Sequence, residues 1–158
     1  MKTVSLFLLI SCTALFATAQ TRQNIVSADS VVVDSHVAFY TYNGPYGSED
    51  NIVKPAIMFV LTVTNKSKTP IPDLQVSNRS QYVNFYINDT IQNPVSMYNG
   101  AEAKGPHLIM PGKSDSYTWW IFESEAYGKV FTIKWQYMNL FSKIHKVNMT
   151  KKTIEPVQ

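Results

Sequence analysis

The segment "AIMFVLTVTN", residues 56–65, alternates between large apolar side chains and a second, mixed set. Successive side chains of an extended strand point to opposite faces, so one face of this segment would be continuously apolar. That face carries Ile57, Phe59, Leu61 and Val63. The opposite face changes from apolar to polar along the segment. The pattern predicts a strand that turns one face into a core and leaves the other partly in solvent.

The same two-residue period recurs in three other segments, and no window longer than about two turns keeps a helical stripe. The side chains expected to face the core are Val31, Val33, Val37 and Phe39 in the first segment, Val83, Phe85 and Ile87 in the second, and Phe131, Ile133, Trp135 and Tyr137 in the third. Turn-forming sequences separate the segments at Asn43-Gly44-Pro45, Pro70-Ile71-Pro72-Asp73, Asn99-Gly100, Gly105-Pro106 and Pro111-Gly112. These connections leave no room for crossover helices, so we expect an all-β domain of about seven to nine antiparallel strands in a β-sandwich.

The N-terminal residues have the layout of a secretory signal peptide. Lys2 precedes an apolar run, residues 4–16, which is followed by the small-residue triplet Ala17-Thr18-Ala19. We expect residues 1–19 to be removed by cleavage before Gln20. The apolar run is too short to be a permanent membrane span. The sequence therefore predicts an exported protein, periplasmic or extracellular.

Residues 20–158 would then form one domain, which is long enough to bury a substantial core. Apolar residues make up 45% of the chain and aromatic residues 13%, so a core without disulfides is plausible. We expect the ordered part to lie between about residues 29 and 152. The ends, residues 20–28 and 153–158, are expected to be loose.

The single cysteine, Cys12, allows a second interpretation of the N-terminus. Leu9-Ile10-Ser11-Cys12 is similar to a bacterial lipobox, in which the cysteine would carry a lipid anchor. Apolar residues continue past it to Phe16, which favours the plain signal peptide. A mature soluble chain would have no cysteine. This excludes thiol nucleophiles and cysteine-based metal sites, and it is more typical of a bacterial than of an animal secreted domain.

The charge is modest, with a formal net value of +3 at pH 7. The one local bias is a basic group near the C-terminus, formed by Lys143, His145, Lys146, Lys151 and Lys152. Such a group is usually a solvated face, and export argues against a nucleic-acid partner. We therefore expect no nucleic-acid binding.

Three stretches, taken in order, carry a resemblance to a known family. They are the strand and turn of Val60–Ser67, the strand of Ser80–Ile87, and the Pro-Gly-x-Ser turn of Pro111–Ser114. Over about residues 58–120 this layout resembles small bacterial immunoglobulin-like domains of the intracellular proteinase inhibitor type. The resemblance implies an immunoglobulin-like fold and, as one alternative function, protease inhibition. The chain departs from the family where Arg79 or Ser80 replaces its usual glycine, and export does not fit an intracellular inhibitor.

Few residues suggest catalysis or metal binding. Asp34 and His36, two apart on one strand face, could supply two metal ligands, but such a pair is more typical of a solvent-facing strand. Glu123 and Glu125 would share a face if their strand continued, as in glycosidases, but "ESEAYGK" fits a connection between strands better. The three histidines fall on separate predicted segments. We expect no enzyme activity, no metal site and no cofactor.

Four Asn-x-Ser/Thr sequons are present, beginning at Asn65, Asn78, Asn88 and Asn148. In a eukaryotic secreted chain they would indicate surface glycans. In a bacterial chain rich in Asn, Ser and Thr they are mostly expected by chance.

The adjacent tryptophans Trp119 and Trp120 must point in opposite directions if residues 116–122 form a strand. One ring should pack between the sheets, and the other should lie on an outer face. The strand register decides which ring is which, and one sequence leaves the register open. The candidate ligand-binding residues are Trp119, Trp120, Tyr40, Tyr42 and Tyr46. Trp135 shares its side with other apolar residues and is expected in the core.

The expected function is that of an exported, non-enzymatic binding module of a bacterial envelope or secretome, with a protein or glycan partner. One alternative is a carbohydrate-binding module that uses the outward tryptophan and the loop Tyr40–Tyr46. Another is a protease inhibitor of the kind it resembles. The outward ring could instead have a purely structural role, as a cross-strand pair that covers the sheet.

Overall fold

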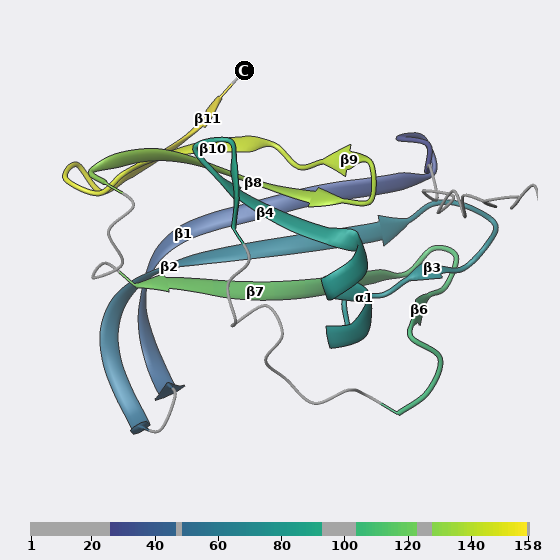
Figure 1. Cartoon of the computed structure of the whole chain (residues 1–158), viewed down its shortest axis with the longest axis horizontal. Helices are drawn as coiled ribbons and strands as arrows, with labels where there is room; N and C mark the ends of the chain where they lie inside the picture. Colours follow the sequence, from purple (N-terminus) through teal and green to yellow (C-terminus); the bar gives the residue numbers. More distant parts are fainter. Residues whose placement is uncertain (1–25, 47–48, 93–103, 123–127, 158) are drawn as a thin grey trace, which may run out of the picture.

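The computed structural model describes residues 26–46, 49–92, 104–122 and 128–157 (Figure 1). The described chain is mostly β-strand with one short helix, and its strand pairings are antiparallel. The prediction of an antiparallel all-β chain is therefore confirmed. Among the described residues, no helix has the length and hydropathy needed to cross a lipid bilayer.

A three-stranded sheet is built around the alternating segment of residues 56–65. Strand β2 (Glu49–Asn65) lies at its centre, between β1 (Val31–Tyr46) and β7 (Ser114–Phe122). Directly paired residues share a face of an antiparallel sheet. Val37, Phe59 and Trp119 form one such row, which faces inward.

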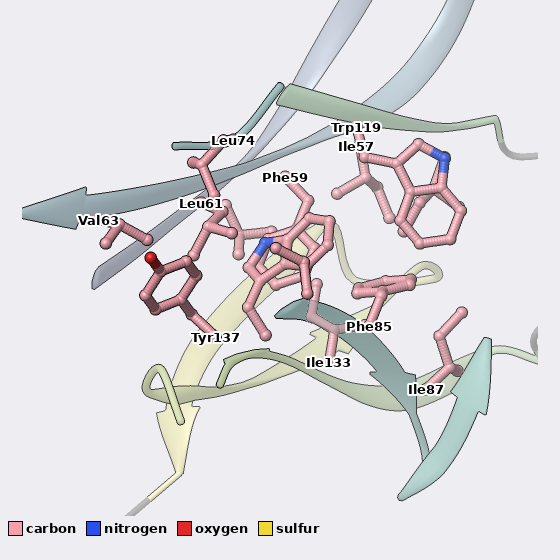
Figure 2. Packing of buried hydrophobic residues seen from close by; sticks show 14 of the residues in the cluster. Ile57, Phe59, Leu61, Val63, Leu74, Phe85, Ile87, Trp119, Ile133 and Tyr137 are labelled. Carbon is pink, nitrogen blue, oxygen red and sulfur yellow. The ribbon is translucent and has the colours of Figure 1, made fainter. Parts of the chain in front are cut away.

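A six-stranded sheet lies opposite it, across the layer of core side chains (Figures 1 and 2). Its main path runs β11 (Thr153–Val157), β10 (Ile144–Asn148), β8 (Val130–Tyr137), β4 (Val83–Ile87) and β5 (Thr90–Gln92). Strand β9 (Leu140–Phe141) pairs with β8. A separate two-stranded sheet joins β3 (Ile71–Pro72) to β6 (Leu108–Ile109), and helix α1 (Val76–Tyr82) leads directly into β4.

The two larger sheets contribute to one core, called here the shared core (Figure 2). Its centre is aromatic: the ring of Phe59 stacks on Trp135 with centroids 4.9 Å apart, and the rings of Phe85 and Trp119 meet edge to face at 3.9 Å. Burial of each large apolar side chain stabilises the fold by about 1.5–3 kcal/mol, and aromatic pairs add about 0.5–1.5 kcal/mol. All side chains predicted to face the core are buried except Val33 and Phe39, which are partly buried.

Asn65, at the end of β2, is the one fully buried polar side chain in the described part of the chain. Its amide nitrogen donates to the carbonyl oxygens of Thr69 (2.8 Å) and Ile109 (2.9 Å), and its side-chain oxygen accepts from the backbone N–H (2.9 Å) and hydroxyl (2.7 Å) of Ser67. Every hydrogen-bonding group of this amide is used, which makes its burial possible. It ties the turn after β2 to strand β6.

The structure differs from the sequence predictions in four places. The Asn43-Gly44-Pro45 turn signal lies inside β1, so the predicted Tyr40–Tyr46 loop is strand. Ser80–Tyr82, read as strand in the family resemblance, is the end of α1. Residues 153–157, expected to be loose, pair with β10 as β11. The described residues form eleven strands rather than seven to nine, because three two-residue strands gave no periodic signal.

The hairpin of β1 and β2 extends beyond the described part of β7. Among the described residues, the last pair that joins β2 to β7 is Ala56 with Phe122, whereas β1 and β2 stay paired as far as Tyr46 and Glu49. In Figure 1 this extension bends away from the six-stranded sheet. The rings of Tyr40 and Tyr42 on β1 lie beside that of Trp120 on β7.

Candidate functional site

The strand register assigns the two adjacent tryptophans to different layers. Trp119 pairs with Phe59 on the inner face, and its side chain is 5% exposed. Trp120 pairs with Met58 on the outer face and is partly buried. Trp119 therefore has no exposed ring to offer a ligand, and only Trp120 remains a candidate. Trp135 lies in the shared core, as predicted.

Three aromatic side chains, Tyr40, Tyr42 and Trp120, gather on the outer face and are called here the outer aromatic group. The ring centroid of Trp120 lies 5.5 Å from that of Tyr40 and 5.1 Å from that of Tyr42. Tyr40 and Tyr42 come from β1, and Trp120 comes from β7 on the far side of β2. Three of the predicted ligand-binding residues are thus brought together. The side chain of the fifth candidate, Tyr46, lies outside the described residues.

A small apolar cluster lies beside the outer aromatic group on the same face. Ile52, Ala56 and Phe122 are buried there, with Tyr42 and Trp120 packed against them. The ring of Tyr42 meets Phe122 edge to face at 5.4 Å, and its hydroxyl donates to the Pro45 carbonyl oxygen at 2.5 Å. These contacts hold Tyr42 in one orientation. Tyr40, in contrast, is 56% exposed and presents its ring to solvent.

The outer face changes from aromatic to polar along the strands. His36, Val60 and Thr118 form the row next to that of Trp120, and Asp34, Thr62 and Ser116 form the following row. Hydroxyl pairs cross the strands, from Thr62 to Ser116 at 3.0 Å and from Thr64 to Ser114 at 2.8 Å. The face therefore combines rings for stacking with donors and acceptors for hydrogen bonds, which is the composition of small-ligand sites.

Asp34 and His36 both project from this face and are exposed. The carboxylate of Asp34 accepts the backbone N–H of the next residue, Ser35, at 2.9 Å. No group of three or more His, Cys, Asp or Glu in the described ranges is placed to hold a metal ion. Glu123 and Glu125, the other candidate pair, lie outside the described residues.

A serine–histidine contact that the sequence did not predict joins the two larger sheets. The hydroxyl of Ser35 on β1 lies 2.9 Å from Nε2 of His145 on β10. Burial lowers the pKa of His145, while a hydrogen bond to the Ser35 backbone and the nearby Asp34 carboxylate act in the opposite direction. A nucleophile–base pair needs a third group that orients the base, together with donors for an oxyanion. The described contacts around His145 support a link between sheets better than they support catalysis.

A second cluster missed at the sequence level surrounds α1. Arg79 is 6% exposed, donates to the Leu74 carbonyl oxygen at 2.6 Å and lies 4.1 Å from the ring centroid of Tyr117. The hydroxyl of Tyr137 donates to the Pro72 carbonyl oxygen at 2.6 Å. These contacts fix the segment that closes one end of the core. Asp73, whose carboxylate accepts the Gln75 backbone N–H at 3.0 Å, is the local turn signal that could have indicated it.

Two of the four sequon asparagines already use their amide nitrogens. Asn65 is fully buried, as described above. The amide nitrogen of Asn78 donates to the Asp73 carboxylate at 2.8 Å and to the His107 carbonyl oxygen at 2.9 Å. A glycan on either nitrogen would break these bonds, so both sequons have a structural role in the folded chain.

No protein-family model matches this chain, and searches of curated proteins and of solved structures return no match.

Proposed function

We propose that this chain is an exported, non-enzymatic binding module with an immunoglobulin-like β-sandwich fold. The observation that carries the proposal is the outer aromatic group, three adjacent rings from two strands on a solvent-facing sheet. Its ligand surface is the outer face of the three-stranded sheet. The signal-peptide pattern of residues 1–19 supports export.

The strand order supports the immunoglobulin-like interpretation. Such domains carry strands A, B and E in one sheet and G, F and C in the other, with C′ added in variable-type domains. Taken in chain order, β1, β2 and β7 occupy the places of A, B and E, and β10, β8, β4 and β5 those of G, F, C and C′. Strand β11 is an addition beside β10. The two-sheet core of interlocking aromatic side chains is also typical of a sandwich.

Glycans are the ligand class that the outer face favours. A sugar ring has an apolar face that stacks on an aromatic side chain, and its hydroxyl groups need donors and acceptors nearby. The rings of Tyr40 and Trp120 would supply the first requirement, and His36, Thr118 and Ser116 on the adjoining rows the second. Tyr42, held by its bond to Pro45, would keep the platform rigid.

A panel of soluble polysaccharides, tested by affinity electrophoresis and calorimetry on residues 20–158, would test this proposal. We expect Trp120→Ala to weaken binding at least about tenfold, because truncation of a central aromatic contact costs about 2 kcal/mol or more. Phe141→Ala is the matched control, since Phe141 is a 53% exposed aromatic residue on the other large sheet. Absence of binding across the panel, or equal losses in the two variants, would contradict the proposal.

A further inference from the structure

Strand β1 forms one edge of the three-stranded sheet, and the direction of its backbone groups can be deduced. In an antiparallel pair, alternate residues exchange hydrogen bonds with the partner strand, and the residues between them turn both backbone groups away. The N–H of Ser35 donates to the Asp34 side chain, so Ser35 belongs to the set that turns away from β2. The other odd-numbered residues as far as Asn43 belong to the same set, namely Val31, Val33, Val37, Phe39, Thr41 and Asn43.

Independent observations agree with this assignment. If Ser35 turns away from β2, the register requires Ser116 on β7 to turn away as well, and its N–H does donate to the Asp115 side chain at 2.8 Å. The N–H of Val31 bonds to the Ser27 carbonyl oxygen instead of to β2. Pro45 lies where the register between β1 and β2 shifts, and a strand tolerates proline at such an irregularity.

This edge is protected at both ends and open in the middle. Near the start, Asp34 covers the N–H of Ser35, and His145 contacts the Ser35 hydroxyl at 2.9 Å. At the far end, Pro45 removes one donor. Between them, the outward backbone groups of Val37, Phe39 and Thr41 have no hydrogen-bond partner within the described ranges. Unpaired groups of this kind are a template for the addition of another strand.

An open depression lies over β1 and β2 at this stretch of the hairpin. It is lined by Phe39, Tyr40, Thr41, Pro55, Ala56 and Lys152. Lys152 comes from the turn between β10 and β11, and its ammonium group lies 5.2 Å from the ring centroid of Phe39. The depression gives an added strand room for a side chain, with a positive charge at its rim.

We propose that the β1 edge between Val37 and Asn43 binds an extended peptide segment of a partner protein by strand addition, with a carboxylate side chain of that segment directed to Lys152. Backbone hydrogen bonds would supply affinity and the lysine would supply selectivity. A second copy of this chain fits less well, because antiparallel pairing of two β1 edges about Phe39 would bring two Lys152 side chains toward each other. Strand addition uses the backbone of the β1 edge and glycan binding uses side chains of the outer face, and Tyr40 borders both sites.

The first test is amide hydrogen exchange of the free protein, resolved by NMR. We expect the N–H groups of Val37, Phe39 and Thr41 to exchange at least about tenfold faster than those of Ala38 and Tyr40, which bond to β2. Equal protection of both sets would show that the edge is already paired and would overturn the proposal.

The second test uses fluorophore-labelled peptides of about seven residues, with alternating Thr and Val and with Glu, Gln or Lys at the centre. We expect the Glu peptide to bind about two- to fivefold more tightly than the Gln peptide at low salt, and the Lys peptide to bind least tightly. The Lys152→Gln variant should bind the three peptides with equal affinity. Equal binding of the three peptides, or no binding, would overturn the proposal.

Thr41 provides a matched pair of variants for the edge itself. Thr41→Pro removes an outward N–H without breaking a bond to β2, so the protein should fold, and peptide binding should fall about two- to tenfold. Thr41→Val keeps the N–H and should bind as the unaltered protein does. If the two variants bind equally well, the peptide does not use this edge. Sedimentation of the unaltered protein and of Thr41→Pro completes the test. If the unaltered protein dimerises and Thr41→Pro does not, the edge binds a second copy of this chain, and the proposal of a partner peptide is overturned.

Discussion

The shared core and the outer aromatic group are built from alternating residues of the same strands, yet their surroundings differ. In the core, Phe59, Phe85 and Trp135 are 0% exposed and contact one another across the two larger sheets. On the outer face, Trp120 and Tyr42 rest on a small apolar cluster, and Tyr40 is mostly in solvent. A step of one residue along β7 moves a ring from the interior to a surface, so an aromatic-rich segment can serve both the core and a binding face.

The largest expected effect is the difference in free energy of unfolding between Trp119→Ala and Trp120→Ala. Trp119→Ala should lower the free energy of unfolding by about 3–5 kcal/mol, because it removes a ring that packs edge to face on Phe85 in a closed interior. Trp120→Ala should cost about 1 kcal/mol, the order of an aromatic pair at a partly exposed site. Urea unfolding of both variants measures the difference. Equal decreases in the free energy of unfolding would mean that Trp120 stabilises the fold as much as Trp119 does.

The next largest effect on the free energy of unfolding is expected from the loss of the buried Asn65 side chain. Asn65→Ala should lower the free energy of unfolding by about 2–3 kcal/mol, because it leaves the Ile109 carbonyl oxygen buried without its donor. Asn148→Ala is the control, since its side-chain oxygen accepts from the Lys151 N–H in an exposed turn. Thermal unfolding should show a clearly larger decrease for Asn65→Ala. Similar decreases would indicate that the turn after β2 tolerates the loss.

Alkaline pH should weaken the core through its buried tyrosines. Burial raises the pKa of Tyr137 and of Tyr117 above the usual value of about 10. The unfolded chain loses these protons first, so stability is complete below pH 10 and decreases as the pH rises above it. Urea unfolding between pH 9 and 11 measures this slope. Tyr137→Phe should reduce it, and an unchanged slope in that variant would exclude Tyr137 as the cause.

The smallest effect is expected at acid pH, at the contact between β1 and β10. Burial lowers the pKa of His145, although the neighbouring Asp34 opposes that shift and His36 and Lys143 support it. The unfolded chain therefore takes up the proton first. Stability should be complete above pH 6.5 and should decrease as the pH falls below it. Melting curves from pH 7.5 to 5 should show a slight decrease that His145→Gln removes. A decrease that persists in this variant would have another source.

The sequence predicted the strands that carry a two-residue period and the faces that they bury, because burial of one face imposes that period directly. It could not decide between Trp119 and Trp120, since their directions depend on pairing with residues about 60 positions away in the chain. The helix α1 was also missed. Its seven residues are fixed by contacts of Arg79 with the Leu74 carbonyl oxygen and the distant Tyr117 ring rather than by an amphipathic pattern of their own.

The candidate site was predicted in its composition but not in its arrangement. Tyr40 and Tyr42 were expected near a tryptophan, but the turn-forming residues Asn43-Gly44-Pro45 suggested a loop where β1 continues. The turn preference of these three residues is overridden by the pairing of β1 with β2 along the hairpin. The open edge of β1 had no sequence signal, because the direction of a backbone N–H depends on register and not on side-chain type.

The burial of Asn65 has a consequence for how this protein should be produced. Oligosaccharyltransferase in a eukaryotic secretory pathway meets a nascent chain before it folds, when Asn65 and Asn78 are still accessible. A sugar attached at that stage would occupy nitrogens that the native state needs for the Thr69, Ile109, Asp73 and His107 oxygens. Yeast or mammalian secretion would then trap part of the product in misfolded form. Expression hosts without N-glycosylation avoid this competition between modification and folding.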